Sequence, residues 1–308
     1  MLESTITLCL IIIVGVCLRL SGFVSVGFAA EVNCFVHKIG LPVLIIAQLT
    51  GAEGNMYMIG RNVSVMALVT LLTFLAAYGL AQMLRMRAPE CLIFVQESFG
   101  GNIVFVGLSL VYVMPNADLG GGTELHRAAT LSVAPVVLLY NILAYGLLRL
   151  CNDTTNAGKM TVGGGGYPLM LSFATVVLGL VFTALELAMP RVVIHGAGML
   201  AEMVMPFGLL AFGMSLCETR SPYGIDAAVL AAFTKVVVAP LLAITACALF
   251  SLDAPSAKAV LLMMAVPASI IMWNVKICSR EQGFSGSLTV LYGALMSITV
   301  NAYILVYV

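Results

Sequence analysis

Runs of about 20 predominantly apolar residues follow one another along nearly the whole 308-residue chain, and only short polar connections separate them. A run of this length can cross the hydrocarbon core of a bilayer as a helix. Only 9% of the residues are charged, whereas a soluble domain has about a quarter, so this chain cannot cover a water-facing surface. Because the runs are continuous and do not alternate, they favour helices over a barrel. The sequence predicts an all-α integral membrane protein.

The predicted transmembrane helices number ten. Their boundaries lie at about 4–21, 27–50, 62–84, 89–114, 125–150, 167–188, 193–217, 226–250, 256–278 and 285–307. We expect the first span to be retained, because no basic segment precedes it and no small-residue cleavage site follows. Lys and Arg favour cytoplasmic loops, and the odd-numbered connections hold seven of them against four in the even-numbered ones. This bias predicts that both termini lie outside.

The most polar and glycine-rich stretch, residues 151–166, divides the chain into two halves of five spans each, 1–150 and 167–308. Five is an odd number, so the halves would have opposite orientations, as in the inverted repeats of secondary transporters. An offset of 164 residues aligns Pro42 with Pro206 in spans two and seven. The prediction is therefore two inverted five-helix repeats joined by a cytoplasmic linker.

Helix-breaking residues fall at corresponding depths in the two halves. Gly100 and Gly101 interrupt span four, and Pro267 interrupts span nine, where the same offset places Ala265 opposite Gly101. Glycine costs about 1 kcal/mol and proline about 3 kcal/mol in a helix interior. In hydrocarbon, broken backbone is tolerated only where protein or a water-filled cavity covers it. These breaks predict a site near the membrane midplane.

Several segments along the chain carry a family resemblance. They are LPVLIIAQL (41–49), GNIVFVGLS (101–109), LLYNILAY (138–145), MPFGLLAFGMSL (205–216) and AVPASIIMWNVKI (265–277). In this order they make the chain similar, over essentially its whole length, to the auxin efflux carrier family in its short bacterial, malate-permease-like form. One departure is Ser109, where many members have proline.

The resemblance implies that interrupted spans four and nine cross. Spans three to five and eight to ten would form a moving transport core. Spans one, two, six and seven would form a scaffold, which is often a homodimer. The implied function is alternating-access transport of a small organic anion, such as a mono- or dicarboxylate, across the bacterial inner membrane. The expected substrate-binding residues are Gly101, Asn102, Gly107, Asn141, Pro267 and Ala268.

Charged residues inside the spans are costly and usually functional. Lys235 lies deep in span eight and is an additional candidate for anion binding. Glu97 either binds a coupling proton or sodium ion, or forms a structural ion pair with Lys235 or Lys276. Lys276 is itself a coupling candidate, or it reaches toward the interface. Asn102 either contacts the substrate through its amide or caps the second half-helix.

Two other classes of function stay open. A cation/proton antiporter or a sodium-coupled symporter could share the crossed-helix fold, with Glu97 in the ion site. A GFSG segment containing Ser285, together with His195, has the residue types of an intramembrane serine protease, which would need the two side chains within about 3 Å. We predict no enzyme activity, cofactor or metal, and the net charge of zero gives no indication of nucleic-acid binding.

Overall fold

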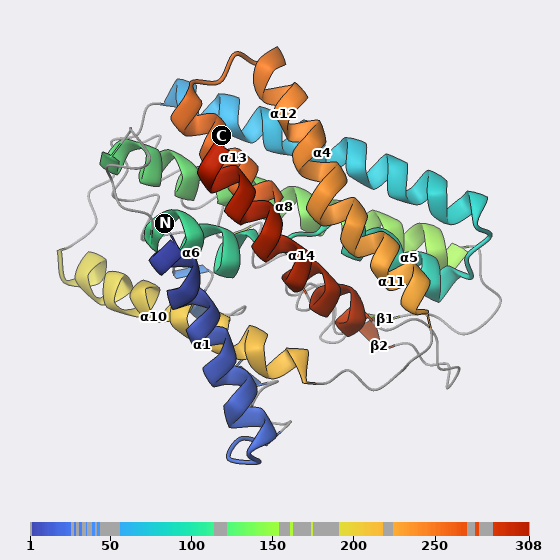
Figure 1. Cartoon of the computed structure of the whole chain (residues 1–308), viewed down its shortest axis with the longest axis horizontal. Helices are drawn as coiled ribbons and strands as arrows, with labels where there is room; N and C mark the ends of the chain where they lie inside the picture. Colours follow the sequence, from blue (N-terminus) through green and yellow to red (C-terminus); the bar gives the residue numbers. More distant parts are fainter. Residues whose placement is uncertain are drawn as a thin grey trace.

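The protein is almost entirely helical in its described part (Figure 1). The structure is a computed structural model that describes residues 2–25, 28, 31–32, 35, 39–40, 42–43, 56–113, 122–153, 161–162, 174, 191–217, 224–269, 275–276 and 286–307. Four helical segments are long and apolar enough to cross a membrane: Tyr57–Met83, Ala129–Cys151, His195–Met214 and Ile225–Leu249. Most of the expected spans 27–50 and 167–188 lies outside the described residues.

Most of the described secondary-structure elements are helices, and the strands are short. The helices are α1 (Leu2–Leu20), α4 (Met56–Met83), α5 (Ala88–Phe99), α6 (Leu108–Val113), α8 (Gly122–Asp153), α10 (Arg191–Leu216), α11 (Ile225–Phe233), α12 (Ala239–Leu249), α13 (Ala254–Met264) and α14 (Gly286–Tyr307). Two π-helical turns, η2 (Ile103–Gly107) and η3 (Thr234–Val238), precede α6 and α12. The strands β1 (Thr161–Val162) and β2 (Val275–Lys276) pair antiparallel.

Helices lie where most of the described spans were expected, with one clear exception. Span nine was expected to run as an interrupted helix to residue 278, but α13 ends at Met264 and Val275–Lys276 is extended as β2. The partner of β2 is β1, which lies inside the predicted linker 151–166. The helical prediction at 275–276 is therefore wrong. Pairing with the linker strand supplies the backbone hydrogen bonds that a helix would have supplied there. Helix α8 also runs three residues into that linker, to Asp153.

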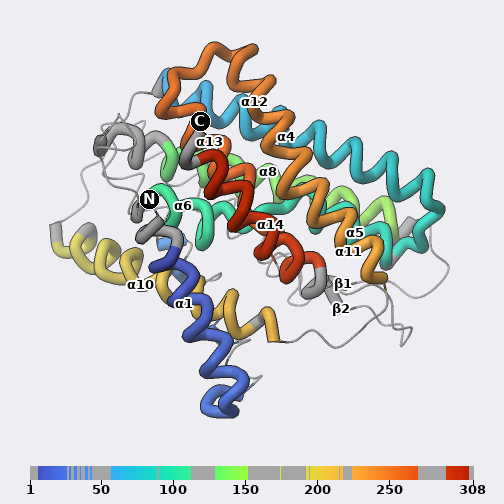
Figure 2. Tube along the Cα trace, in the orientation of Figure 1, coloured from blue at the N-terminus to red at the C-terminus, as the bar shows by residue number. Residues whose placement is uncertain are grey.

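Two helices stand apart from the rest. In Figure 1 and in the trace of Figure 2, α1 and α10 cross each other at one side of the molecule. Glycines allow the close crossing: a methyl group at Gly213 would lie 2.1 Å from the Ile12 carbonyl oxygen, and one at Gly15 would lie 2.3 Å from the Leu210 oxygen. Small residues permit this kind of backbone approach between membrane helices.

One continuous buried cluster runs through the other helices and also includes Leu8 of α1 and Val204 and Phe212 of α10. Helix α4 packs against α5, α8 and α12, while α11 packs against α14. The pair of α1 and α10 touches this group chiefly through η2, α6 and α14. The breaks described below lie inside this larger group.

One turn recurs almost unchanged in the two halves. It joins α4 to α5 and α12 to α13, with a left-handed residue in each case: Arg85 (φ 52°) and Ser251 (φ 49°). The same three N–H to carbonyl bonds close both turns: Leu84 to Leu80, Arg85 to Gln82 and Met86 to Ala81 in the first, and Phe250 to Ala246, Ser251 to Ala248 and Leu252 to Cys247 in the second.

These two turns lie 166 residues apart, as the positions of Arg85 and Ser251 show. The helices after them, α5 and α13, both begin with Ala-Pro. A left-handed residue followed by a proline is a common way to end one helix and start the next. The offset of 164 inferred from the sequence is therefore two residues too small at this point.

Candidate functional site

The first helix break lies between α5 and η2. Helix α5 ends at Phe99, Gly100 is extended (φ −78°, ψ 97°), and Asn102 begins the π-helical turn η2. The second break follows α13, which ends at Met264, and continues through Pro267 to Ser269. The first interruption falls at the glycine pair that predicted it, and α13 ends before Pro267, with residues 265–269 non-helical.

The two breaks lie directly against each other. The Asn102 N–H donates to the Pro267 carbonyl at 2.9 Å, and the Ser269 N–H donates to the Gly100 carbonyl at 3.1 Å. Gly101 thereby faces Ala268 in an antiparallel bridge. Buried backbone groups must find partners inside the protein. Here each break supplies a hydrogen-bond partner for a backbone group of the other.

Helix α14 satisfies a further group at the second break. The carbonyl of Ala265 accepts from Ser297 Oγ at 2.7 Å and from Asn301 Nδ2 at 3.3 Å. Asn301 Nδ2 also donates to Ser297 Oγ at 2.8 Å. Our sequence reasoning missed this pair. Its signal is two polar residues four apart on one face of an otherwise apolar helix.

Asn102 caps the π-helical turn η2, which was one of the two roles expected for it. Its Oδ1 accepts a hydrogen bond from the Phe105 N–H at 3.2 Å. The side chain is buried, at 3% exposure, and its Nδ2 has no hydrogen-bond partner among the described residues. A buried donor without a partner costs roughly 1–3 kcal/mol. The amide is therefore available to an acceptor that enters the site.

Lys235 reaches the crossing from η3. It is 1% exposed, and a methyl group built on Gly101 would lie 2.6 Å from its Cε and 2.8 Å from its Nζ. The ammonium group thus occupies space that a side chain at position 101 would fill. No hydrogen bond or ion pair of Lys235 occurs within the part of the chain that the structure describes.

The π-helical turn helps to place this lysine. The Ala239 N–H bonds to the Thr234 carbonyl five residues back, so the turn holds one more residue than an α-helical turn. Such turns are rare and often mark functional sites. Both halves contain one near the crossing, η2 after the first break and η3 beside it.

Glu97 lies on α5, one turn before the first break. It is 7% exposed, and its Oε2 has no partner among the described residues. The expected alternative of an ion pair between Glu97 and Lys235 is not formed in this structure. Among the side chains whose burial is described, these two are the only charged ones that are buried. Buried charges are expensive unless paired, which marks both residues as functional candidates.

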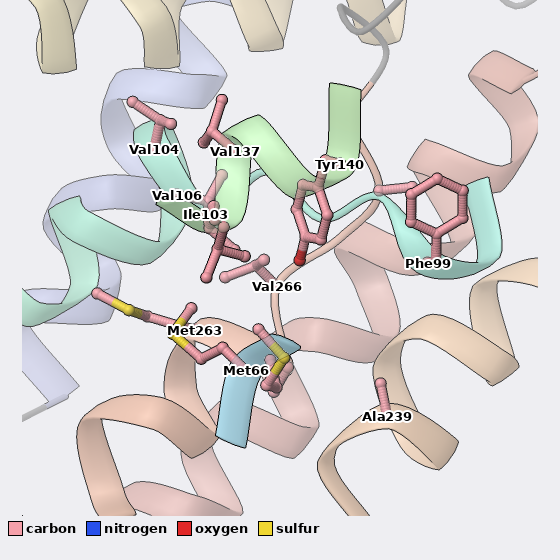
Figure 3. Packing of buried hydrophobic residues seen from close by; sticks show 14 of the residues in the cluster. Met66, Phe99, Ile103, Val104, Val106, Val137, Tyr140, Ala239, Met263 and Val266 are labelled. Carbon is pink, nitrogen blue, oxygen red and sulfur yellow. The ribbon is translucent and has the colours of Figure 1, made fainter. Parts of the chain in front are cut away.

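Helix α8 directs Tyr140 at the crossing. The Tyr140 hydroxyl lies close to the Gly101 backbone and the Thr70 side chain, and its ring meets Phe99 edge-on at 5.9 Å (Figure 3). Asn141, which the resemblance suggested, is only half-buried and lies outside the buried face that Tyr140 shares. Helical periodicity of the apolar residues on α8 could have identified Tyr140.

Of the remaining predicted site residues, some lie in the described part of the chain and others do not. Gly107 is buried in η2, where a methyl group would lie 3.5 Å from Val266, so it contacts the second break. The Lys276 side chain and Ser285 lie outside the described part. His195, the suggested base of a protease, is exposed on α10.

Together these features define a helical membrane protein with a buried polar cluster where the break between α5 and η2 lies against the segment that follows α13. No family model matches the chain, and no curated protein sequence matches it.

Proposed function

We propose that the protein is a secondary carrier that moves a small organic anion, such as a mono- or dicarboxylate, across the bacterial inner membrane by alternating access. The observation that carries this proposal is the pair of buried donors at the crossing. Asn102 Nδ2 and the Lys235 ammonium both lack partners there, in the part of the chain that is described. An anion would satisfy both donors at once.

The proposed architecture is ten membrane helices in two inverted repeats, with crossed interrupted spans four and nine. The recurring turn at Arg85 and Ser251 supports the repeat, because a duplicated unit retains its backbone geometry. The mutual hydrogen bonds of Asn102 and Ser269 support the crossing. We expect both termini on the outer side.

A division into transport core and scaffold is supported by the grouping of the helices. Helices α1 and α10 correspond to spans one and seven of the expected scaffold, and they pack on each other at the side of the remaining spans. The side chain of Phe105 on η2 meets Gly208 on α10, where an added methyl group would lie 2.2 Å from its ring. A moving core would slide at this contact. We expect the scaffold also to form a homodimer.

Cation transport is the second candidate, and buried Glu97 favours it. An unpaired carboxylate at membrane depth can bind a proton or sodium ion. Lys235 against the crossing opposes a cation there, because its ammonium would repel it. We therefore place Glu97 in coupling, as the residue that would carry a proton or sodium ion with the anion.

The test is uptake into proteoliposomes of labelled lactate, malate, amino acids and sodium, with and without a pH or sodium gradient. Asn102→Ser keeps an oxygen that can cap η2 but removes the amide donor. We expect it to fold normally and to lose carboxylate flux by about tenfold or more, the size of one hydrogen bond to a charged group. Saturable flux of sodium alone, with none of any carboxylate, would refute the anion carrier in favour of the cation carrier.

A further inference from the structure

We infer that the substrate is a monovalent anion with a single carboxylate, whose one charge is balanced by Lys235. This inference rests on the proposed function and narrows it, because the crossing provides one cation and no more among the described residues. Lys235 and Glu97 are the only buried charged side chains whose burial is described, and Glu97 carries the opposite sign. The other donors at the crossing, Asn102 Nδ2 and the Tyr140 hydroxyl, are neutral.

The position equivalent to Lys235 in the first half carries no charge. The recurring turns relate the end of α4 to the end of α12 by 166 residues, as Arg85 and Ser251 show. Because η3 contains one extra residue, the offset between the halves is smaller by one for residues that precede it in the chain. Lys235 therefore corresponds to Val69 or Thr70 on α4, neither of which is charged, and both are buried. The repeated backbone offers two such positions, and only one of them carries a cation.

A second carboxylate on the substrate would find an unfavourable environment. Among the buried hydrophobic residues drawn in Figure 3, Phe99, Ile103, Val106, Met263 and Val266 offer a second carboxylate no polar group. A carboxylate among them would lose its hydration without gaining a partner. The remainder of the substrate is therefore expected to be uncharged.

The test is direct binding to the purified full-length protein in nanodiscs, measured by isothermal titration calorimetry. Two pairs of acids differ by one carboxylate: lactate with malate, and propionate with succinate. We expect each monocarboxylate to bind at least tenfold more tightly than its partner. Lys235→Met is expected to weaken monocarboxylate binding at least tenfold, and Lys235→Arg, which keeps the charge, is expected to weaken it less.

A second arm adds a cation at the equivalent position. Val69→Lys is expected to raise the affinity for malate relative to lactate, by about tenfold. If this variant does not fold, the wild-type ratio of the matched acids still decides. Equal or tighter binding of the dicarboxylates, or a lactate affinity that Lys235→Met leaves unchanged in the folded protein, overturns the inference and leaves an anion carrier. Absence of binding and flux for every carboxylate overturns the proposed function as well.

Discussion

A single methyl group at position 101 should move the ammonium of Lys235 without unfolding the protein. In Gly101→Ala the new carbon would lie 2.6 Å from Lys235 Cε and 3.0 Å from Val266 Cγ2. Carbon atoms prefer a separation of about 3.5–4.0 Å, so the lysine end must retreat by about 1 Å. Gly101 does not have the positive φ found at Gly22 and Gly224, so alanine introduces no backbone strain.

The effect on anion binding follows from this displacement. At an effective dielectric constant of about 20, two unit charges attract by about 5.5 kcal/mol at 3 Å and about 4.2 kcal/mol at 4 Å. A retreat of about 1 Å therefore removes about 1.4 kcal/mol, which is a tenfold loss of affinity. The folded protein should lose no more than about 1 kcal/mol of stability, because the flexible end of a lysine can adopt another rotamer.

The assay is a double-mutant cycle on lactate affinity, with Gly101→Ala and Lys235→Met alone and combined. If the methyl acts through the lysine, it should weaken binding about tenfold in the wild type and hardly at all in the Lys235→Met background. Gly146→Ala on α8, where nothing lies within 4 Å, is the matched control and should leave affinity unchanged. An equal loss in both backgrounds would show that the methyl blocks the site by itself and would refute the assignment of Lys235.

Two further predictions concern the framework around the site. Gly213→Ala should destabilise the protein by about 1–3 kcal/mol, because its methyl would press on the Ile12 carbonyl; Gly79→Ala on α4, with open space around it, is the control, and equal thermal unfolding temperatures of the two variants would contradict the close crossing. Ser297→Ala should cost about 1–2 kcal/mol through the lost hydrogen bond to the Ala265 carbonyl, so an unchanged unfolding temperature would mean that Asn301 alone satisfies this carbonyl.

Much of the framework could be predicted because a bilayer imposes simple rules. Apolar length set the spans, and glycine and proline set the breaks at Gly100, Gly101 and Pro267. The alignment between the halves was harder. An apolar helix can be shifted by a residue or two without any change in composition, and only the hydrogen bonds at Arg85 and Ser251 fix the offset.

The side chains at the site were predicted less completely, for geometric reasons. Lys235 was recognised from its charge, but its contact with Gly101 depends on a π-helical turn that no local sequence signal reveals. Tyr140 was not predicted, because the amide of its neighbour Asn141 was taken as the polar group of this helix. The buried face of α8 contains Tyr140 and not Asn141. Val275 and Lys276 were assigned to a helix because their partner strand lies more than 100 residues away in sequence.

The crossing also changes what must recognise an anion. Helix N-termini generally offer free backbone N–H groups to an anion, yet the N–H groups of Asn102 and Ser269 already bond to the opposite break. The Phe105 N–H is likewise taken by the Asn102 side chain. The backbone groups at the crossing therefore largely bond to one another. These bonds hold the two breaks together in the absence of substrate. Side chains must therefore recognise the anion. These side chains differ between the two halves, because Lys235 belongs to one half and Glu97 to the other. Changes of substrate should therefore come from substitutions on α5 and η3, with the backbone of the crossing kept as it is.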